Sequence, residues 1–224
     1  MSFSTEWEER YAANTHLSVW PWTDVVSLVH RHCKTLIAGG GRVLELGCGA
    51  GANIPLFRAL GVDYYAIDGS PTIVKQLHDR YPDMLENIVC GDFTLDQKLG
   101  LNFNLVLDRA SLTHNNTVSI KRALHIAFES LTEGGIFIGV DWFSKNHSDA
   151  HEGDAVDDEY TRFHHNAGQF TGVGKVHFSD EAHIRNLFES FDIVFMEEKL
   201  MRRHEPNDNH QFASWNIVAR KPGV

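Results

Sequence analysis

The sequence has 224 residues, of which 42% are hydrophobic and 22% charged, a balance typical of a globular chain with a full core. A formal net charge of −10 argues against general binding to a nucleic-acid backbone, because such proteins need a basic surface. No run of about 18 apolar residues is present and the start of the chain lacks a basic, apolar leader, so we expect neither a membrane span nor a secretory signal. Three cysteines without zinc-type spacing favour a reduced, cytoplasmic protein.

Apolar patterns with helical and strand periods alternate along the first two thirds of the chain. Residues 22–37 predict a helix, which the run Gly39-Gly40-Gly41 ends. Short apolar runs predict strands at 42–46, 63–67, 87–90, 103–107 and 136–140, with helices at 53–60, 71–81 and 118–131. Such alternation predicts an α/β fold with a mostly parallel sheet and helices on both faces.

The last third of the chain is less regular. Residues 141–178 show no clear period, and Ser179 is expected to cap a helix that reaches Ser190. Two β-rich runs, 192–197 and 212–219, are joined by the polar loop 202–210, and they predict an antiparallel hairpin because no helix separates them. We therefore expect one domain over residues 1–224, with a seven-stranded sheet, an N-terminal cap segment at 1–38 and a substrate-side insertion or lid at 141–178.

A glycine-rich turn, Glu45-x-Gly47-x-Gly49-x-Gly51, separates the first strand from the next helix. Glycine allows a tight turn and a close approach of ligand to backbone, and open α/β sheets bind ligands at the carboxyl ends of their strands. Dinucleotide enzymes carry G-x-G-x-x-G, whereas here the third glycine comes one residue sooner and an acidic residue precedes the first. A carboxylate at that place repels a pyrophosphate but suits the ammonium group of an amino acid.

Residues 43–53 resemble motif I of the class I S-adenosylmethionine (SAM)-dependent methyltransferases, and strand order and spacing extend the resemblance to about residue 219. The resemblance implies a Rossmann-like fold and SAM as the cofactor. It implies that Asp68 binds both ribose hydroxyls, that Gly69 and Ser70 follow the ribose edge, and that Asp92 and Phe93 meet the adenine. It also implies that the methionine part of SAM is lined by Glu45, Gly47, Cys48, Gly49 and Gly51.

Two further segments enter through the same resemblance. Asp108 to Ala110 match the segment that faces the methionine and the transferred methyl, and Glu133 replaces the usual proline in the turn before strand five. In small-molecule members of the family an N-terminal segment often folds over the cofactor. Tyr11 or Trp20 would then cover the sulfonium, since an aromatic face attracts a cation; alternatively these rings only pack the first helix onto the sheet.

Methyl transfer to oxygen often needs a base, and the candidates by position are Asp108, Asp141, His114, His147 and His151. His114 has a structural interpretation as well, because many relatives carry a structural histidine there. Asp108 and Asp141 fall at neighbouring strand ends, where catechol-type methyltransferases hold magnesium. Trp142 stands where that type has Asn, so we expect no metal.

Residues 146–160 are acidic and contain no Lys or Arg, and histidines at 147, 151, 164 and 165 interrupt or flank them. The stretch has three interpretations: a solvated loop, a lid over the pocket, or a metal site that uses the histidines. We favour the lid. We expect it to disfavour anionic substrates unless Arg109, Arg162, Arg202 or Arg203 reaches the pocket.

The sequence thus predicts an enzyme that transfers a methyl group from SAM to a small-molecule acceptor, with oxygen preferred over nitrogen, and releases S-adenosylhomocysteine (SAH). Asp108, Asp141 and His114 are the candidate catalytic residues, and Asp108 is also expected to contact the cofactor. Neither nucleic acid nor a membrane is expected as a partner, and the oligomeric state is left open. Two alternatives remain: a nicotinamide-dependent oxidoreductase on a similar fold, and a SAM-binding protein without turnover.

Overall fold

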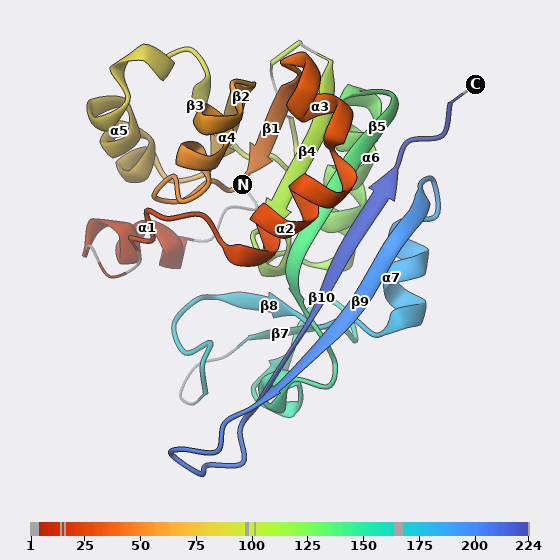
Figure 1. Ribbon diagram of the computed structural model, residues 1–224. Coiled ribbons are helices and arrows are strands. Elements are labelled where there is room, and N and C mark those ends of the chain that lie inside the picture. Colours follow the sequence, from red (N-terminus) through yellow and green to blue (C-terminus); the bar gives the residue numbers. More distant parts are fainter. Residues whose placement is uncertain are drawn as a thin grey trace.

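A seven-stranded sheet with the order β3-β2-β1-β4-β5-β10-β9 forms the centre of the protein (Figure 1). The computed structural model describes residues 5–13, 15, 17–96, 99–100, 102–163 and 168–223. Five strands run parallel: β1 (Arg42–Leu46), β2 (Asp63–Asp68), β3 (Ile88–Cys90), β4 (Phe103–Arg109) and β5 (Leu131–Phe143). β10 (Gln211–Arg220) pairs antiparallel with β5 and with β9 (Asp192–Arg202), so the predicted mixed sheet and its C-terminal hairpin are confirmed.

Helices cover both faces of the sheet because successive strand side chains point to opposite sides. Val43 faces α2 (Thr23–His32), α4 (Ile54–Leu60) and α5 (Pro71–Arg80), within one apolar cluster. Leu44 faces α6 (Thr117–Ser130) and α7 (Glu181–Leu187), within a second cluster. Both side chains are fully buried, although they point to opposite faces of β1, which is why apolar residues stand next to each other in this strand.

Several boundaries differ from those expected. The predicted helix 22–37 is two helices, α2 and α3 (Lys34–Gly39), because the backbone leaves the helical conformation at Cys33. The strand expected at 136–140 begins at Leu131 and ends at Phe143. Asp180, not Ser179, caps α7 by accepting a hydrogen bond from the His183 amide, since Ser179 is held in a β-bridge with Ser144.

The segment 141–178 contains more regular structure than its sequence indicates. A second, three-stranded sheet is formed by β6 (Asp154–Ala155), β7 (Thr161–Phe163) and β8 (Lys175–His177), preceded by a short 3-10 helix, η3 (Ser148–His151). Some acidic side chains of this segment form ion pairs: the carboxylate of Asp157, for example, lies 2.5 Å from Nζ of Lys175. His164 and His165 lie outside the described residues.

The carboxyl ends of β1, β2, β4 and β5 meet at one edge of the main sheet. Beyond this edge lie α1 (Thr5–Ala12), a helix that was not predicted from the sequence, and the sheet of β7 and β8 (Figure 1). The 3-10 helices η1 (Pro82–Met84) and η2 (Leu112–His114) complete the elements. Within the described ranges, no helix is long and apolar enough to cross a bilayer.

Candidate active site

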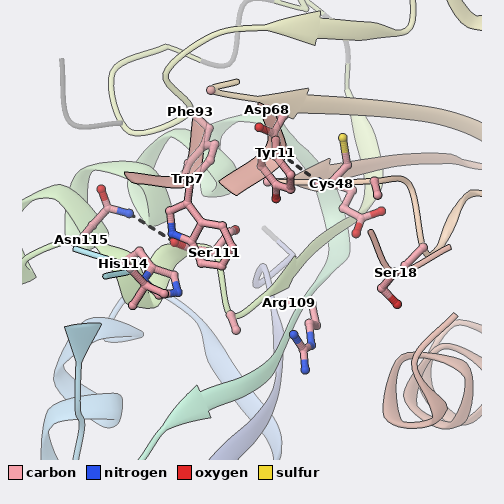
Figure 2. A pocket seen from close by; sticks show the side chains of 18 of the residues that line it. Trp7, Tyr11, Ser18, Cys48, Asp68, Phe93, Arg109, Ser111, His114 and Asn115 are labelled. Carbon is pink, nitrogen blue, oxygen red and sulfur yellow. Dashed lines mark hydrogen bonds between the residues drawn. The ribbon is translucent and has the colours of Figure 1, made fainter. Parts of the chain in front are cut away.

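A cavity of about 400 Å³ lies at the carboxyl ends of the parallel strands. Its walls come from the glycine turn after β1, the ends of β2 and β4, α1, η2, and residues 169–173 (Figure 2). This is the place where open α/β sheets bind ligands. Its size is within the range of small-molecule sites.

The glycines of the turn divide into two groups. Gly47 and Gly49 line the cavity with positive φ angles of 67° and 50°, and a Cβ on Gly47 would lie 2.3 Å from Cβ of Ser111. Gly51 does not line the cavity: a Cβ there would meet Ile54 and Leu77 at 2.7 and 2.8 Å. Gly51 is therefore required for packing, and the other two leave bare backbone beside the cavity.

Glu45 carries a buried carboxylate that faces the cavity from the end of β1. One oxygen accepts a hydrogen bond from Nδ2 of Asn53 at 2.8 Å and the other from the hydroxyl of Tyr64 at 2.6 Å. Both donors are neutral, and no cationic side chain of the described residues forms an ion pair with it. Burial raises the pKa of Glu45 to about 7. Oδ1 of Asn53, which also lines the cavity, is buried without a hydrogen-bond partner in the described structure. The pair therefore offers acceptors to a cation.

Asp68 ends β2 and its carboxylate accepts two backbone hydrogen bonds, from Gly49 at 2.8 Å and from Ser70 at 2.9 Å. Burial raises its pKa to about 6, against the effect of these hydrogen bonds. Gly69 lines the cavity beside it, but Ser70 does not. The Ser70 hydroxyl is fully buried and caps α5 through the amide of Ile73, so Ser70 supports the site from behind.

Asp92 and Phe93 line the cavity just after the next strand end. Oδ1 of Asp92 accepts hydrogen bonds from the amide and the hydroxyl of Thr94. The ring of Phe93 is mostly buried and approaches the position that a Cβ on Gly47 would take, at 3.6 Å. The two strand ends are therefore close enough to contact one ligand.

The helix α1 places two aromatic rings in the cavity. Tyr11 lies beside Asp68 and Cys48, and its hydroxyl is 2.9 Å from the position that a Cβ on Gly49 would take (Figure 2). Trp7, one turn earlier, lines the cavity as well. The expectation for Trp20 is wrong, because its side chain is 75% exposed and lies outside the cavity, in the stretch before α2.

Polar contacts on two sides fasten α1. Glu8 accepts hydrogen bonds from the hydroxyls of Ser70 and Thr72. Arg10 donates to the carbonyl oxygens of Thr171 and Gly172. The helix therefore links the cofactor side of the cavity to the wall formed by residues 169–173.

Asp108 does not reach the cavity, which corrects its prediction as a base and a cofactor contact. It is fully buried and accepts hydrogen bonds from the Ser111 hydroxyl, the Leu112 amide and Nε1 of Trp142, the last at 2.7 Å. Burial raises its pKa to about 6. Asp108 shapes the turn after β4 and is not positioned for proton transfer to a substrate.

Asp141 is also outside the cavity lining. Its carboxylate lies 2.9 Å from Nη2 of Arg109 and 2.9 Å from Nζ of Lys199, which in turn pairs with Asp24. Burial alone would raise the pKa of Asp141, but the two cations hold it below its usual value. Asp141 is therefore held by two cations, and Asp108 and Asp141 are each engaged by other groups of the described structure.

Of the three candidate catalytic residues, His114 is the one that lines the cavity. Its Nδ1 lies 3.0 Å from the carbonyl oxygen of Lys175. Because a carbonyl only accepts, Nδ1 carries the hydrogen and Nε2 keeps a lone pair. Burial lowers the pKa of His114 to about 4, and Arg109 and Arg10 add to the effect, so the ring is neutral at pH 7.

The wall opposite the glycine turn is aromatic and was not predicted in detail. Phe143 and Phe170 line it, together with Arg109, whose guanidinium lies 3.7 Å from the centre of the Trp22 ring. Arg162, Arg202 and Arg203 do not line the cavity. His147 and His151 are also outside it, and His151 is exposed.

A mixed sheet of this order, with an acidic and glycine-rich turn facing a cavity, is typical of Rossmann-like SAM-dependent methyltransferases. The sequence matches the family described as "Methyltransferase domain" over residues 11–196, and the chain therefore belongs to this family. The bare backbone at Gly47 and Gly49 and the uncompensated carboxylate of Glu45 fit SAM, which carries an ammonium group. The nicotinamide alternative is not supported.

Solved structures agree with this assignment at the level of the fold. A SAM-dependent methyltransferase from Methanosarcina mazei is 15% identical, with a TM-score of 0.67 over 92% of this chain and 100% of the other. A SAM-dependent methyltransferase from Clostridium acetobutylicum is 15% identical, with a TM-score of 0.63 over 97% and 96%. SAM-bound CalS10, an amino pentose methyltransferase from Micromonospora echinaspora, is 16% identical, with a TM-score of 0.58 over 98% and 97%. No curated protein matches the sequence.

Proposed function

We propose that this methyltransferase transfers the methyl group of SAM to a hydroxyl oxygen of a small molecule, and that His114 accepts the hydroxyl proton. The observation that carries the proposal is the fixed tautomer of His114, whose Nδ1–H donates to the Lys175 carbonyl at 3.0 Å. Nε2 is left as a neutral acceptor on a cavity-lining ring. In the reaction the S–CH3 bond breaks and the O–CH3 bond forms. The proton moves to Nε2, and SAH is released.

For the cofactor we propose that Glu45 and the free Oδ1 of Asn53 hold the ammonium group of SAM. Asp68 would accept the ribose hydroxyls, because its carboxylate has two lone-pair positions left after the Gly49 and Ser70 amides. These groups fix the cofactor, so that the chain's main contribution to rate is alignment of the methyl group with its acceptor.

The ring side chains complete the cofactor site. Asp92 and Phe93 would meet the adenine, and the rings of Tyr11 and Trp7 would cover the methionine and sulfonium end. Residues 141–178 supply the far wall through Phe143 and Phe170, which supports the interpretation of this segment as the substrate side.

The acceptor is expected to be small and to carry no net charge. Arg109 reaches the cavity, but it belongs to a chain of charges in which Asp141 and Asp24 balance Arg109 and Lys199. The aromatic wall favours an acceptor with an apolar face. Several structurally similar enzymes act on small molecules, including the amino pentose methyltransferase named above.

The test is a screen of small hydroxyl and amine acceptors with methyl-labelled SAM, followed by a comparison of wild type with His114→Gln. We expect a hydroxyl acceptor, and a loss of kcat of about 10²- to 10⁴-fold in the variant while SAH affinity is unchanged. His125→Gln is the matched control, because His125 is exposed on α6. The proposal would be refuted if only amines are methylated. It would also be refuted if His114→Gln methylates a hydroxyl acceptor with the same kcat as wild type. Binding without any transfer would favour a protein that has lost turnover.

A further inference from the structure

Outside the cofactor cavity, two histidines and an aspartate converge from distant parts of the sequence. His147 caps η3, Asp149 lies within η3, and His210 directly precedes β10. One ligand atom of each residue lies within 4.8 Å of the others. Such a group is a common ligand set for a transition-metal ion.

The carboxylate of Asp149 is buried, and its two oxygens face different groups of the described structure. Its Oδ2 accepts from the amide of Gln169 at 2.7 Å, whereas Oδ1 lies 3.5 Å from Nε2 of His210. That separation is long for a hydrogen bond, but two ligands about 2.0–2.1 Å from one tetrahedral zinc ion are separated by roughly this distance. Nε2 of His210 is buried and has no hydrogen-bond partner among the described residues.

Aromatic side chains surround His147, the remaining member of the cluster. The ring of His147 is 5.1 Å from that of Phe170 and 5.3 Å from that of Phe212, and 1% of the residue is exposed. A carboxylate beside such an apolar wall is stabilised by a cation. The amide of Asp149 donates to Nδ1 of His147 at 3.0 Å. Coordination through Nδ1 of this imidazole would replace that hydrogen bond by a metal–nitrogen bond.

We propose that His147, Asp149 and His210 form a zinc site, with water in the fourth position. Two imidazoles and one carboxylate suit Zn²⁺, whereas Mg²⁺ and Ca²⁺ prefer oxygen ligands. The ion joins η3 to the β9–β10 loop. It also steadies the cavity wall, because Gln169 and Phe170 contact the cluster on one side and line the cavity on the other.

The test is titration of the untagged, chelator-treated protein with Zn²⁺ and with Co²⁺, whose visible absorption reports four-coordinate nitrogen and oxygen ligation. We expect one equivalent bound, a higher melting temperature on metal addition, and at least about tenfold weaker binding in His210→Ala. His204→Ala is the matched control, since His204 is an exposed histidine of the same loop, and it should bind like wild type.

A second variant keeps the test decisive if His210→Ala alters the loop. Asp149→Asn retains an oxygen for the Gln169 amide but removes the charge, and it should also bind metal at least about tenfold more weakly, with circular dichroism confirming its fold. The proposal is overturned if wild type binds no equivalent of either ion at micromolar concentration, or if His210→Ala or Asp149→Asn binds as tightly as wild type. None of these readouts depends on methyl transfer.

Discussion

The substitution Asp68→Asn tests whether the carboxylate of Asp68 accepts hydrogen bonds from the ribose hydroxyls of the cofactor. The carboxylate has about four lone-pair positions, and the amides of Gly49 and Ser70 occupy two of them. The remaining two are available to the ribose hydroxyls of SAM or SAH. Asparagine replaces one carboxylate oxygen by an NH2 group, which cannot accept these bonds.

The expected loss follows from this count. One charge-assisted hydrogen bond contributes about 1.5–3 kcal/mol, so the dissociation constant for SAH should rise about 10- to 150-fold. Stability is a poor readout here, because removing a buried charge and losing a backbone hydrogen bond oppose each other. Affinity measured by calorimetric titration is the informative quantity.

Asp63→Asn provides the control, because Asp63 begins the same strand and is exposed at its other end. It should bind SAH like wild type. The loss of even one such bond predicts a dissociation constant for SAH that is about tenfold higher. If folded Asp68→Asn protein binds SAH within about twofold of wild type, Asp68 is not the ribose acceptor and the reasoning fails.

The same carboxylate gives a pH dependence with a defined sign. Burial raises the pKa of Asp68 to about 6 and that of Glu45 to about 7 in the free protein. Binding to the ionised forms lowers both pKa values, so affinity is full above pH 7 and falls as the pH decreases through 7 and then 6. Titrations from pH 8 to pH 5, which extend about one unit beyond each of the two pKa values, should show this decline in wild type and only the Glu45 component in Asp68→Asn. Affinity independent of pH over this range would contradict the assignment of both residues.

Two further substitutions, and a third that serves as a control, test the surrounding structure. Gly47→Ala should lower SAH affinity at least about tenfold and destabilise the fold by about 1–2 kcal/mol or more, because the residue has a positive φ and its new Cβ would overlap that of Ser111; binding like wild type in titration would contradict this. Trp142→Phe should lower the free energy of unfolding by about 2–4 kcal/mol, since Asp108 loses the indole donor inside the core. In denaturant unfolding, Trp20→Phe should change stability by less than about 0.5 kcal/mol, because that ring is exposed, and equal effects of the two tryptophan substitutions would contradict both placements.

Local patterns were sufficient to predict most of the sheet. The strand expected at 42–46 coincides with β1. A short, mostly apolar run between the glycines that end a helix and a glycine-rich turn can form few structures other than a strand. The helix α1 was not predicted, since eight residues do not form a stable helix alone and this one depends on contacts of Glu8 and Arg10 with residues far along the chain. The sheet of β6, β7 and β8 was missed for a similar reason, because its strands are only two or three residues long.

The cavity lies at the strand ends where the sequence predicts the candidate site, but not every predicted residue lines it. The acidic and glycine residues lie at the ends of strands, and sequence patterns indicate where strands end. Glu45, Asp68 and Asp92 could therefore be assigned to the edge of the sheet where the cavity lies. Which carboxylates are already engaged depends on side chains distant in sequence: Trp142 binds Asp108, and Lys199 binds Asp141. No local pattern contains that information.

One omission had a signal in the sequence. Trp7 and Tyr11 are four residues apart, a spacing that puts both on one face of a helix. Trp20 has no such relation to Tyr11. The helical spacing therefore distinguishes the ring that shares the cavity from the ring that is exposed.

The position of α1 has a consequence for engineering substrate choice. Trp7 meets the His114 ring edge-on at 5.0 Å, while Tyr11, on the same short helix, lies against the glycine turn. Given the roles proposed for Tyr11 and His114, we expect substitutions on this helix to change the Michaelis constants of cofactor and acceptor together. Redesign of selectivity should begin instead at Phe143 and Phe170 on the far wall, where a change in shape leaves the contacts of the glycine turn intact.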